Sequence, residues 1–310
     1  YGDHRDLHYP LRRQRQMCIR DRIRIASRSS PLAIKQCDIL IEKLPSLKTK
    51  IIKIVSKGDE IQDKSLQEIG GKGLFIKKLE QALIDNVADI AVHSLKDMEW
   101  KETNGLEIAA FLQRGSRKDI LISKYKSIYE LPTNAKLGTS SVRRKAFILS
   151  ERPDLNISIL RGNINTRINK YNSGKFDGIV LAQAGVERLD LKTKYTEFDE
   201  SIMLPSAGQG AIAVQCRSNN KQILNLIRSL NHEQTKYETL AERSFVFNLN
   251  GTCSSPIGAS AKISNEILEL YGALASPDGA LITKDNISGF YKDAEKLGKD
   301  LAIKIINQMK

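Results

Sequence analysis

The segment 88–97, Ala-Asp-Ile-Ala-Val-His-Ser-Leu-Lys-Asp, predicts a short buried strand that ends in polar and charged residues. Upstream of it, the glycine-rich loop 70–73 opens a segment with the apolar spacing of a helix, and residues 50–56 alternate as a strand. Nearer the N-terminus, Ser30-Pro31 is a typical helix start and follows a strand at 22–27. This order of strands and helices predicts a largely parallel sheet with helical crossovers.

A second unit with the same rhythm follows the linker 113–116. Its predicted elements are strands at 136–138, 156–160 and 177–181, with helices over 142–151 and 164–171. A second crossing segment, 205–210, leads to an extra strand at 211–215 that is expected to return to the first sheet. Two α/β lobes joined by two crossing segments predict a hinged cleft.

From residue 233 the pattern changes to a small α+β unit. A long helix is expected to run to about Asn250 and to end at Gly251, a typical C-terminal stop. Three antiparallel strands (about 258–264, 267–274 and 280–287) and a closing helix over about 292–309 are expected after it. The predicted fold is α/β with three domains, formed by residues 22–112 plus 211–228, residues 117–205 and residues 233–310. Residues 1–21 show no helical or strand period and are expected to be a disordered or artefactual extension.

The positive charge of the chain belongs mainly to its folded body. The sequence has 49 Lys and Arg against 36 Asp and Glu, a formal net charge of +13, and residues 1–21 hold five Arg and three Asp, which leaves +11. Nucleic acid is disfavoured as a partner because the basic residues are dispersed among acidic ones and only 6% of residues are aromatic. No apolar run approaches the roughly 18 residues of a membrane span.

Cysteine and histidine are sparse. The four cysteines are widely spaced without a Cys-x-x-Cys, which fits neither a disulfide framework nor a structural zinc site and indicates a reducing, cytosolic setting. Cys37 and Cys216 follow apolar patterns and are expected to be packing residues. Only His93 and His232 lie in the body, so multi-histidine metal chemistry is not expected.

Basic residues gather where strands end and helices begin, the place where open parallel sheets bind ligands and where helix N-termini favour anions. The clusters are Arg28 with Ser30, Lys72 in its glycine loop, Thr139, Ser140 and Ser141 with Arg143 and Arg144, and Arg161 with Arg167. Each alone is typical of solvated surface charge, but together they predict a cleft for a polyanion. Neither a P-loop nor a Rossmann glycine spacing occurs, which favours several small carboxylates over a nucleotide.

For three other residues, the sequence allows either a chemical or a purely structural role. Asp97, at a strand end, could stabilise a cation or move a proton, or it could simply cap a helix or pair with Lys96. His93 is more typical of a buried, hydrogen-bonded histidine than of a base. Cys253 lies in a loop of small polar residues, where it is accessible to covalent chemistry, although a loop cysteine is often incidental.

Seven motifs in this order resemble the porphobilinogen deaminase (hydroxymethylbilane synthase) family, from about residue 22 to the C-terminus. They are Arg28-Ser29-Ser30-Pro31-Leu32-Ala33, Gly70-Gly71-Lys72-Gly73-Leu74-Phe75, His93-Ser94-Leu95-Lys96-Asp97, Gly138-Thr139-Ser140-Ser141-x-Arg143-Arg144, Arg161-Gly162-Asn163-x-x-Thr166-Arg167, Gly208-Gln209-Gly210 and the Cys253 loop. Each motif alone is modest, whereas all seven in register are specific.

The resemblance implies two lobes built like periplasmic binding proteins around a cleft, and a dipyrromethane cofactor tethered by a thioether to Cys253. It implies a cytoplasmic, monomeric transferase that adds four porphobilinogen molecules head to tail with loss of ammonia and releases linear hydroxymethylbilane by hydrolysis, with no nucleic-acid, membrane or metal partner. By motif match, Asp97 is the catalytic carboxylate. The resemblance assigns the cofactor carboxylates to Lys96, Arg143, Arg144, Ser141, Thr139, Ser30 and Lys72, and the substrate carboxylates to Arg28, Arg161, Arg167 and Gln209.

The residues suit this chemistry. Each porphobilinogen carries two carboxylates, so a growing chain needs many fixed cations, and a nearby carboxylate lowers the energy of the electron-poor azafulvene that forms when ammonia leaves. The chain departs from the family pattern at Glu68, at Thr252 and at Glu99-Trp100. The competing hypothesis is a non-enzymatic, two-lobed protein that closes on a small anion, which gives Asp97 and Cys253 no role.

Overall fold

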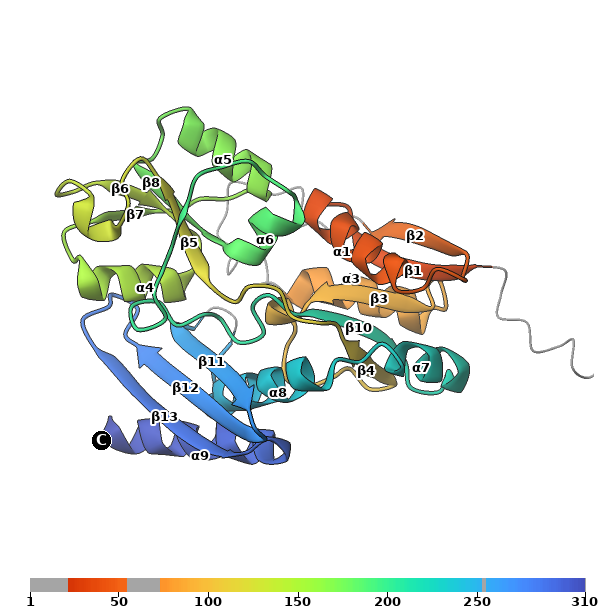
Figure 1. The fold of residues 1–310 in the computed structure, drawn as a ribbon. Helices are drawn as coiled ribbons and strands as arrows, with labels where there is room; N and C mark the ends of the chain where they lie inside the picture. The colour runs from red at the N-terminus through yellow and green to blue at the C-terminus, as the bar shows by residue number, and fades with distance from the viewer. Residues whose placement is uncertain (1–21, 55–72, 253–254, 310) are drawn as a thin grey trace, which may run out of the picture.

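Two five-stranded sheets and one three-stranded sheet organise the chain in the computed structural model, which describes residues 22–54, 73–252 and 255–309 (Figure 1). The expected extension, residues 1–21, lies outside the described residues. In the described part, no helix is long and apolar enough to cross a membrane. The expected three-part α/β architecture is confirmed.

The first five-stranded sheet and its helices form the first lobe, with strand order β2-β1-β3-β10-β4. Its strands are β1 (Ile23–Arg28), β2 (Thr49–Ile54), β3 (Ile90–Ser94), β4 (Leu106–Phe111) and β10 (Ile212–Arg217), and its helices are α1 (Pro31–Glu42), α3 (Gly73–Ile84) and α7 (Lys221–Arg228). Apolar residues of α1 and α7 pack on one face of the sheet, and those of α3 pack on the other. Cys37 and Cys216 are buried and free, as expected for packing residues.

The second lobe has the strand order β7-β6-β8-β5-β9. Its strands are β5 (Asp119–Ser123), β6 (Lys136–Gly138), β7 (Asn156–Ser158), β8 (Gly178–Ala182) and β9 (Thr196–Glu197), and its helices are α4 (Val142–Glu151), α5 (Ile164–Asn172) and α6 (Gln183–Arg188). Helix α4 covers one face of the sheet, while α5 and α6 cover the other.

The prediction of largely parallel sheets is confirmed, with one reversed strand in each lobe. Strands β1, β2 and β3 are parallel, as are β6, β7 and β8. However, β10 runs antiparallel to β3 and β4, and β5 runs antiparallel to β8 and β9. Both reversed strands follow directly after a crossing between the lobes. Strand β10 does return to the first sheet, as expected, whereas β5, β9, α6 and α7 had no counterpart in the sequence-based prediction.

The C-terminal part is a three-stranded antiparallel sheet with order β11-β12-β13, covered by two helices. Its elements are α8 (Glu233–Asn248), β11 (Ile257–Ser264), β12 (Ile267–Ala275), β13 (Ile282–Phe290) and α9 (Ala294–Gln308). The predicted glycine stop needs correction, because Asn250 and not Gly251 adopts the left-handed backbone, with φ of 53°. Gly251 is needed for space, since a Cβ there would lie 2.3 Å from Cδ1 of Ile257.

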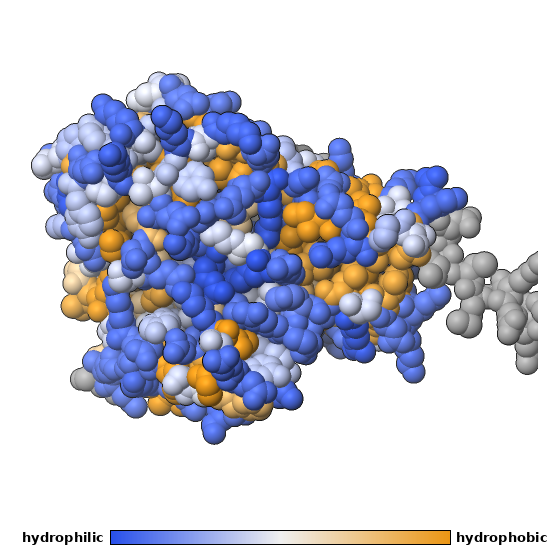
Figure 2. Space-filling view, viewed as in Figure 1, coloured by the Kyte–Doolittle hydropathy of each residue, from blue (hydrophilic) through white to orange (hydrophobic). Residues whose placement is uncertain are grey.

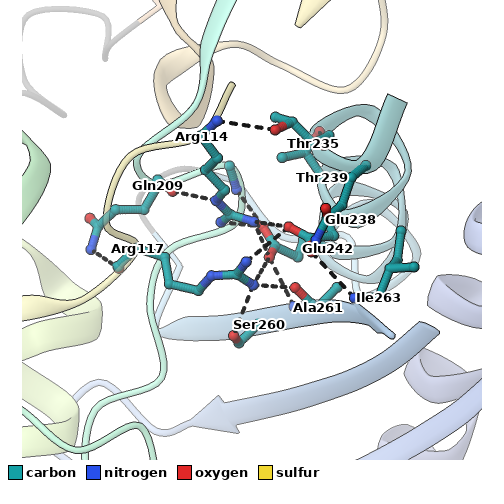
Figure 3. A network of polar contacts seen from close by, with 12 residues as sticks. Arg114, Arg117, Gln209, Thr235, Glu238, Thr239, Glu242, Ser260, Ala261 and Ile263 are labelled. Carbon is teal, nitrogen blue, oxygen red and sulfur yellow. Dashed lines mark hydrogen bonds and ion pairs between the residues drawn. The ribbon is translucent and has the colours of Figure 1, made fainter. Parts of the chain in front are cut away.

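A buried carboxylate on α8 holds the two segments that cross between the lobes, which are residues 112–118 and 198–211 (Figure 3). Glu242, which is 0% exposed, accepts from both Nη atoms of Arg114 at 2.8 and 2.9 Å. It also accepts from the backbone N–H groups of Gly208 at 2.8 Å and Ala261 at 2.9 Å. Arg117 adds an ion pair with Glu238 at 2.8 Å. The C-terminal part therefore holds both crossing segments by charge-assisted hydrogen bonds.

Replacing Glu242 by glutamine is expected to lower the free energy of unfolding by about 3–5 kcal/mol, because the buried Arg114 guanidinium then loses its counter-ion. Urea denaturation followed by circular dichroism measures this change. The exposed Glu269 provides a matched control, and Glu269→Gln should alter stability by no more than about 0.5 kcal/mol. Equal effects of the two substitutions would contradict the role given to Glu242.

Candidate active site between the lobes

Lys96 and Asp97 lie at the carboxyl end of β3, a buried strand between β1 and β10. They belong to a single 3₁₀ turn, Leu95–Asp97, that Leu95 anchors by its burial. The Nζ atom of Lys96 donates to Oε1 of Gln209, in the second crossing segment, at 3.1 Å. The strand thus places a cation and a carboxylate at the junction of the lobes, where hydrophilic residues gather on the face shown in Figure 2.

The N-terminus of α4 contributes two arginines that are buried and not surface charges. Ser141 caps the helix by accepting from the backbone N–H of Arg144 at 3.4 Å, and Thr139 Oγ1 accepts from the N–H of Ser141 at 3.2 Å. Arg143 and Arg144 each place an Nη2 atom 2.7 Å from a carboxylate oxygen of Asp119. Burial raises the pKa of Asp119, but the two guanidinium groups outweigh it and lower that pKa to about 2.

The N-terminus of α5 adds two more arginines to the same site. Arg167 donates from Nε to the carbonyl of Gly162 at 2.8 Å. Desolvation by burial, followed by repulsion from Arg144 and Arg161, lowers the pKa of Arg167 to about 10, against an opposing effect of Asp97. Asp97 of the first lobe therefore acts electrostatically on Arg167 of the second lobe. In addition, the buried Nη1 of Arg161 has no hydrogen-bond partner among the described residues.

The other residues expected at the site are placed less centrally or not at all. Ser30 caps α1 by accepting from the N–H of Ala33 at 3.3 Å, and Arg28 ends β1. Gln209 is 0% exposed and surrounded by protein groups. Lys72, Cys253 and Glu68 lie outside the described residues. Next to Cys253, the N–H of Thr252 donates to Oγ of Ser255 at 3.0 Å.

Two residues at this junction were missed by the sequence analysis. Asp119 begins β5, and the signal that could have found it is an acidic residue at the start of the apolar run Ile120–Ile122. Arg188, at the end of α6, donates from Nη2 to the carbonyl of Gly210 at 2.5 Å. Arg188 also lines an open groove between α1 and α6, together with Lys35 and Lys53.

His93 is a buried structural histidine, 4% exposed, whose Nε2 lies 3.1 Å from Oε1 of Gln215. Burial lowers its pKa to about 4, against the opposing effects of Glu80, Gln215 and Asp97. The described residues contain no group of three His, Cys, Asp or Glu side chains that could hold a metal ion.

The His93 environment predicts a loss of stability in mild acid. An unfolded histidine has a pKa near 6.5, so the unfolded chain binds a proton that the folded chain excludes, and stability present above about pH 6.5 is lost as the pH falls toward 4. The expected loss between pH 7 and pH 5 is about 2 kcal/mol from this residue, measured by urea denaturation. His93→Gln should flatten the slope, whereas His232→Asn should retain it. A slope unchanged in His93→Gln would contradict the assignment.

Comparison with known proteins gives the family. The description "Porphobilinogen deaminase, dipyromethane cofactor binding domain" matches residues 23–225, and "Porphobilinogen deaminase, C-terminal domain" matches residues 236–307. Curated relatives named porphobilinogen deaminase, from two strains of Buchnera aphidicola subsp. Acyrthosiphon pisum, are 46% identical over 290 residues, which is 92% of this chain and 92% of each relative.

The solved structures found by comparison have much lower identity and TM-scores below 0.5. A periplasmic domain of BvgS from Bordetella pertussis is 12% identical with a TM-score of 0.39, covering 72% of this chain and 92% of that domain. An arginine-specific periplasmic binding protein of Salmonella typhimurium is 11% identical with a TM-score of 0.37, covering 69% of this chain and 93% of its own. On the evidence of the family matches and the curated relatives, the chain belongs to the porphobilinogen deaminase family of transferases, which use a dipyrromethane cofactor.

Proposed function

We propose that this chain is a hydroxymethylbilane synthase. It condenses four porphobilinogen molecules head to tail on a covalently attached dipyrromethane, with release of ammonia, and then frees linear hydroxymethylbilane by hydrolysis. The observation that carries the proposal is the electrostatic effect of Asp97, from the first lobe, on Arg167 of the second lobe, where Arg144 and Arg161 act on the same guanidinium. The proposal includes the three domains expected from the sequence and a monomeric enzyme that works in the cytoplasm.

The described residues fit a group with several carboxylates. The buried Nη1 of Arg161 and Nε of Arg143 have no hydrogen-bond partner among the described residues, and a carboxylate is the natural acceptor for a guanidinium fork. When bound through a thioether to Cys253, the dipyrromethane supplies a nucleophilic pyrrole carbon to which substrate units are joined. We assign its carboxylates to Lys96, Arg143, Arg144, Ser141, Thr139, Ser30 and Lys72, and those of the substrate to Arg28, Arg161 and Arg167.

Asp97 performs the central electrostatic task. Loss of ammonia from the aminomethyl group of porphobilinogen leaves positive charge on the pyrrole, and a carboxylate held at the end of a rigid strand stabilises that charge. The same carboxylate can accept a hydrogen bond from the pyrrole N–H and hold a proton at its oxygen. The arginines orient the substrate by its acetate and propionate groups. Closure of the lobes would exclude water until the product is released.

Stoichiometry tests this proposal. The purified protein, incubated with porphobilinogen, should release four molecules of ammonia for each linear tetrapyrrole formed. If it bound porphobilinogen and returned it unchanged, the non-enzymatic anion-binding protein would be the correct description. Sedimentation analysis of the same sample tests the monomer.

A further inference from the structure

A buried chain of polar groups joins the cation of the first lobe to two arginines of the second. Lys96 Nζ donates to Gln209 Oε1 at 3.1 Å, and Gln209 Nε2 donates to Asp119 Oδ1 at 2.9 Å. Asp119 in turn contacts Arg143 and Arg144. Asp119 and Gln209 are both 0% exposed, so neither side chain is presented to solvent. Side chains from both lobes and from the second crossing segment therefore form one continuous network of hydrogen bonds and ion pairs.

Asp119 sets the orientation of both guanidinium groups. Arg144 directs Nε and Nη2 to Asp119 Oδ1 at 3.0 and 2.7 Å, and its Nη1 donates to the carbonyl of Val180 at 2.9 Å. Arg143 pairs with Oδ2 of Asp119 and donates to the carbonyl of Leu204 at 2.6 Å. Two neighbouring buried guanidinium groups would repel each other without this carboxylate. Asp119 thus holds both arginines in fixed directions. The three side chains together carry a net charge of +1.

Gln209 is suited to join Lys96 to Asp119 because an amide carries an acceptor and a donor on one carbon. Its Oε1 accepts from the ammonium, while its Nε2 donates to the carboxylate and to the carbonyl of Arg117 at 2.8 Å. A carboxylate at this position would face Asp119 as a like charge, and a hydrophobic side chain would satisfy neither neighbour.

The neighbouring glycines fix the direction of the Gln209 side chain. Gly208 and Gly210 have φ of 69° and 84°, in the left-handed region that favours glycine. A Cβ on Gly210 would lie 2.5 Å from the carbonyl oxygen of Ser116, which belongs to the other crossing segment. The close approach of the two segments therefore depends on the Gly-Gln-Gly motif, and it directs the amide between Lys96 and Asp119.

We propose that Asp119 and Gln209 are positioning residues of the condensation site, which hold Lys96, Arg143 and Arg144 in one fixed pattern for the carboxylates of porphobilinogen and the growing chain. This inference rests on the proposed function and deepens it. It also changes the role of Gln209 from a substrate ligand to a residue that acts through its neighbours.

Gln209→Met is the decisive substitution, because it keeps the length of the side chain, removes no charge and deletes the hydrogen bonds to Lys96, Asp119 and the carbonyl of Arg117. The KM for porphobilinogen should rise about tenfold, the loss expected for one hydrogen bond to a charged group, while kcat stays within about twofold. A purely structural role would lower the amount of active protein, and hence the apparent kcat, without moving KM. An unchanged KM in folded Gln209→Met would overturn the inference.

Gln183→Met is the matched control. Gln183 is also buried and also bonds the first crossing segment, accepting from Ser116 Oγ at 2.6 Å, but it has no contact with Lys96 or the two arginines. Its substitution should leave KM within about twofold. An equal rise of KM in both variants would show a general effect of loosening the crossing segments and would also contradict the inference.

Asp119→Asn tests the other half of the chain of contacts. It should raise KM more than Gln209→Met does, because both arginines lose their counter-ion, provided circular dichroism shows a folded protein. If Asp119→Asn does not fold, Gln209→Met still decides the question.

The inference can fail separately from the proposed function. Calorimetric titration of Asp97→Asn with porphobilinogen, with and without Gln209→Met, measures affinity without turnover. An equal dissociation constant in the two proteins would reject the positioning role even if the wild-type chain makes the tetrapyrrole. Conversely, a wild-type chain that forms no tetrapyrrole would reject the proposed function, while a tenfold difference in affinity would still support the positioning role.

Discussion

Asp97→Asn should lower the rate of tetrapyrrole formation by about 10²–10³-fold, the loss typical of removing one group that stabilises charge in a transition state. Asparagine keeps the size and polarity of the side chain but not the negative charge. The charge matters because the site is otherwise rich in cations. Asp97, in the first lobe, opposes the lowering of the pKa of Arg167 in the second lobe. Without it, positive charge developing on the substrate would meet only repulsion from the arginines.

The measurement is the initial rate of ammonia release at saturating porphobilinogen, with folding checked by circular dichroism. Because the substrate carboxylates are assigned to the arginines, KM should change much less than kcat. Asp85→Asn, an exposed position on the same lobe, serves as the control and should retain full activity. Wild-type activity in Asp97→Asn would remove the residue from the mechanism.

Cys253→Ala should abolish both the covalent cofactor and the activity. The intact wild-type chain is expected to exceed its sequence mass by a two-pyrrole adduct, seen by mass spectrometry of the denatured protein, and the variant should show only its sequence mass. The two described cysteines are unsuited to the attachment, because burial raises the pKa of Cys37 and of Cys216 to about 11 and so suppresses the nucleophilic thiolate.

Cys216→Ala is the matched control for this experiment and should keep the adduct. An adduct that survives in Cys253→Ala would place the attachment elsewhere, and an unmodified but active wild-type chain would reject the covalent tether altogether. The two experiments separate anchoring from chemistry, since Asp97→Asn should keep an adduct that Cys253→Ala loses.

Much of the fold follows from local patterns. The helix start at Ser30 was predicted from its capping residue, and its hydroxyl group does accept from the first turn of the helix. Strand β3 was predicted from its apolar run, and the return of β10 to the first sheet from its place after the second crossing. Strand β5 was missed because its five residues follow directly on the charged residues of the linker, and the reversed directions of β5 and β10 depend on pairing partners far away in the sequence.

The candidate site can likewise be divided into residues that local motifs identify and residues that only the tertiary structure identifies. The seven motifs identify the family and name residues such as Asp97 and Arg167, because each motif is a contiguous stretch with a local function. Asp119 belongs to none of them, yet it decides the orientation of two arginines that do. This role of Asp119 depends on the tertiary structure, which brings the start of strand β5 to the N-terminus of α4.

The sequence by itself determined the order of strands and helices, the family and the residue types available for chemistry. Only the tertiary structure decided which groups interact: Asp97 acts on Arg167 of the other lobe, Asp119 pairs with Arg143 and Arg144, and Gln209 lies between Lys96 and Asp119. The physical reason is that secondary structure depends on neighbours in the chain, whereas electrostatic energy depends on distance and burial in space. Groups 24 to 113 positions apart form these contacts, and no local pattern encodes them.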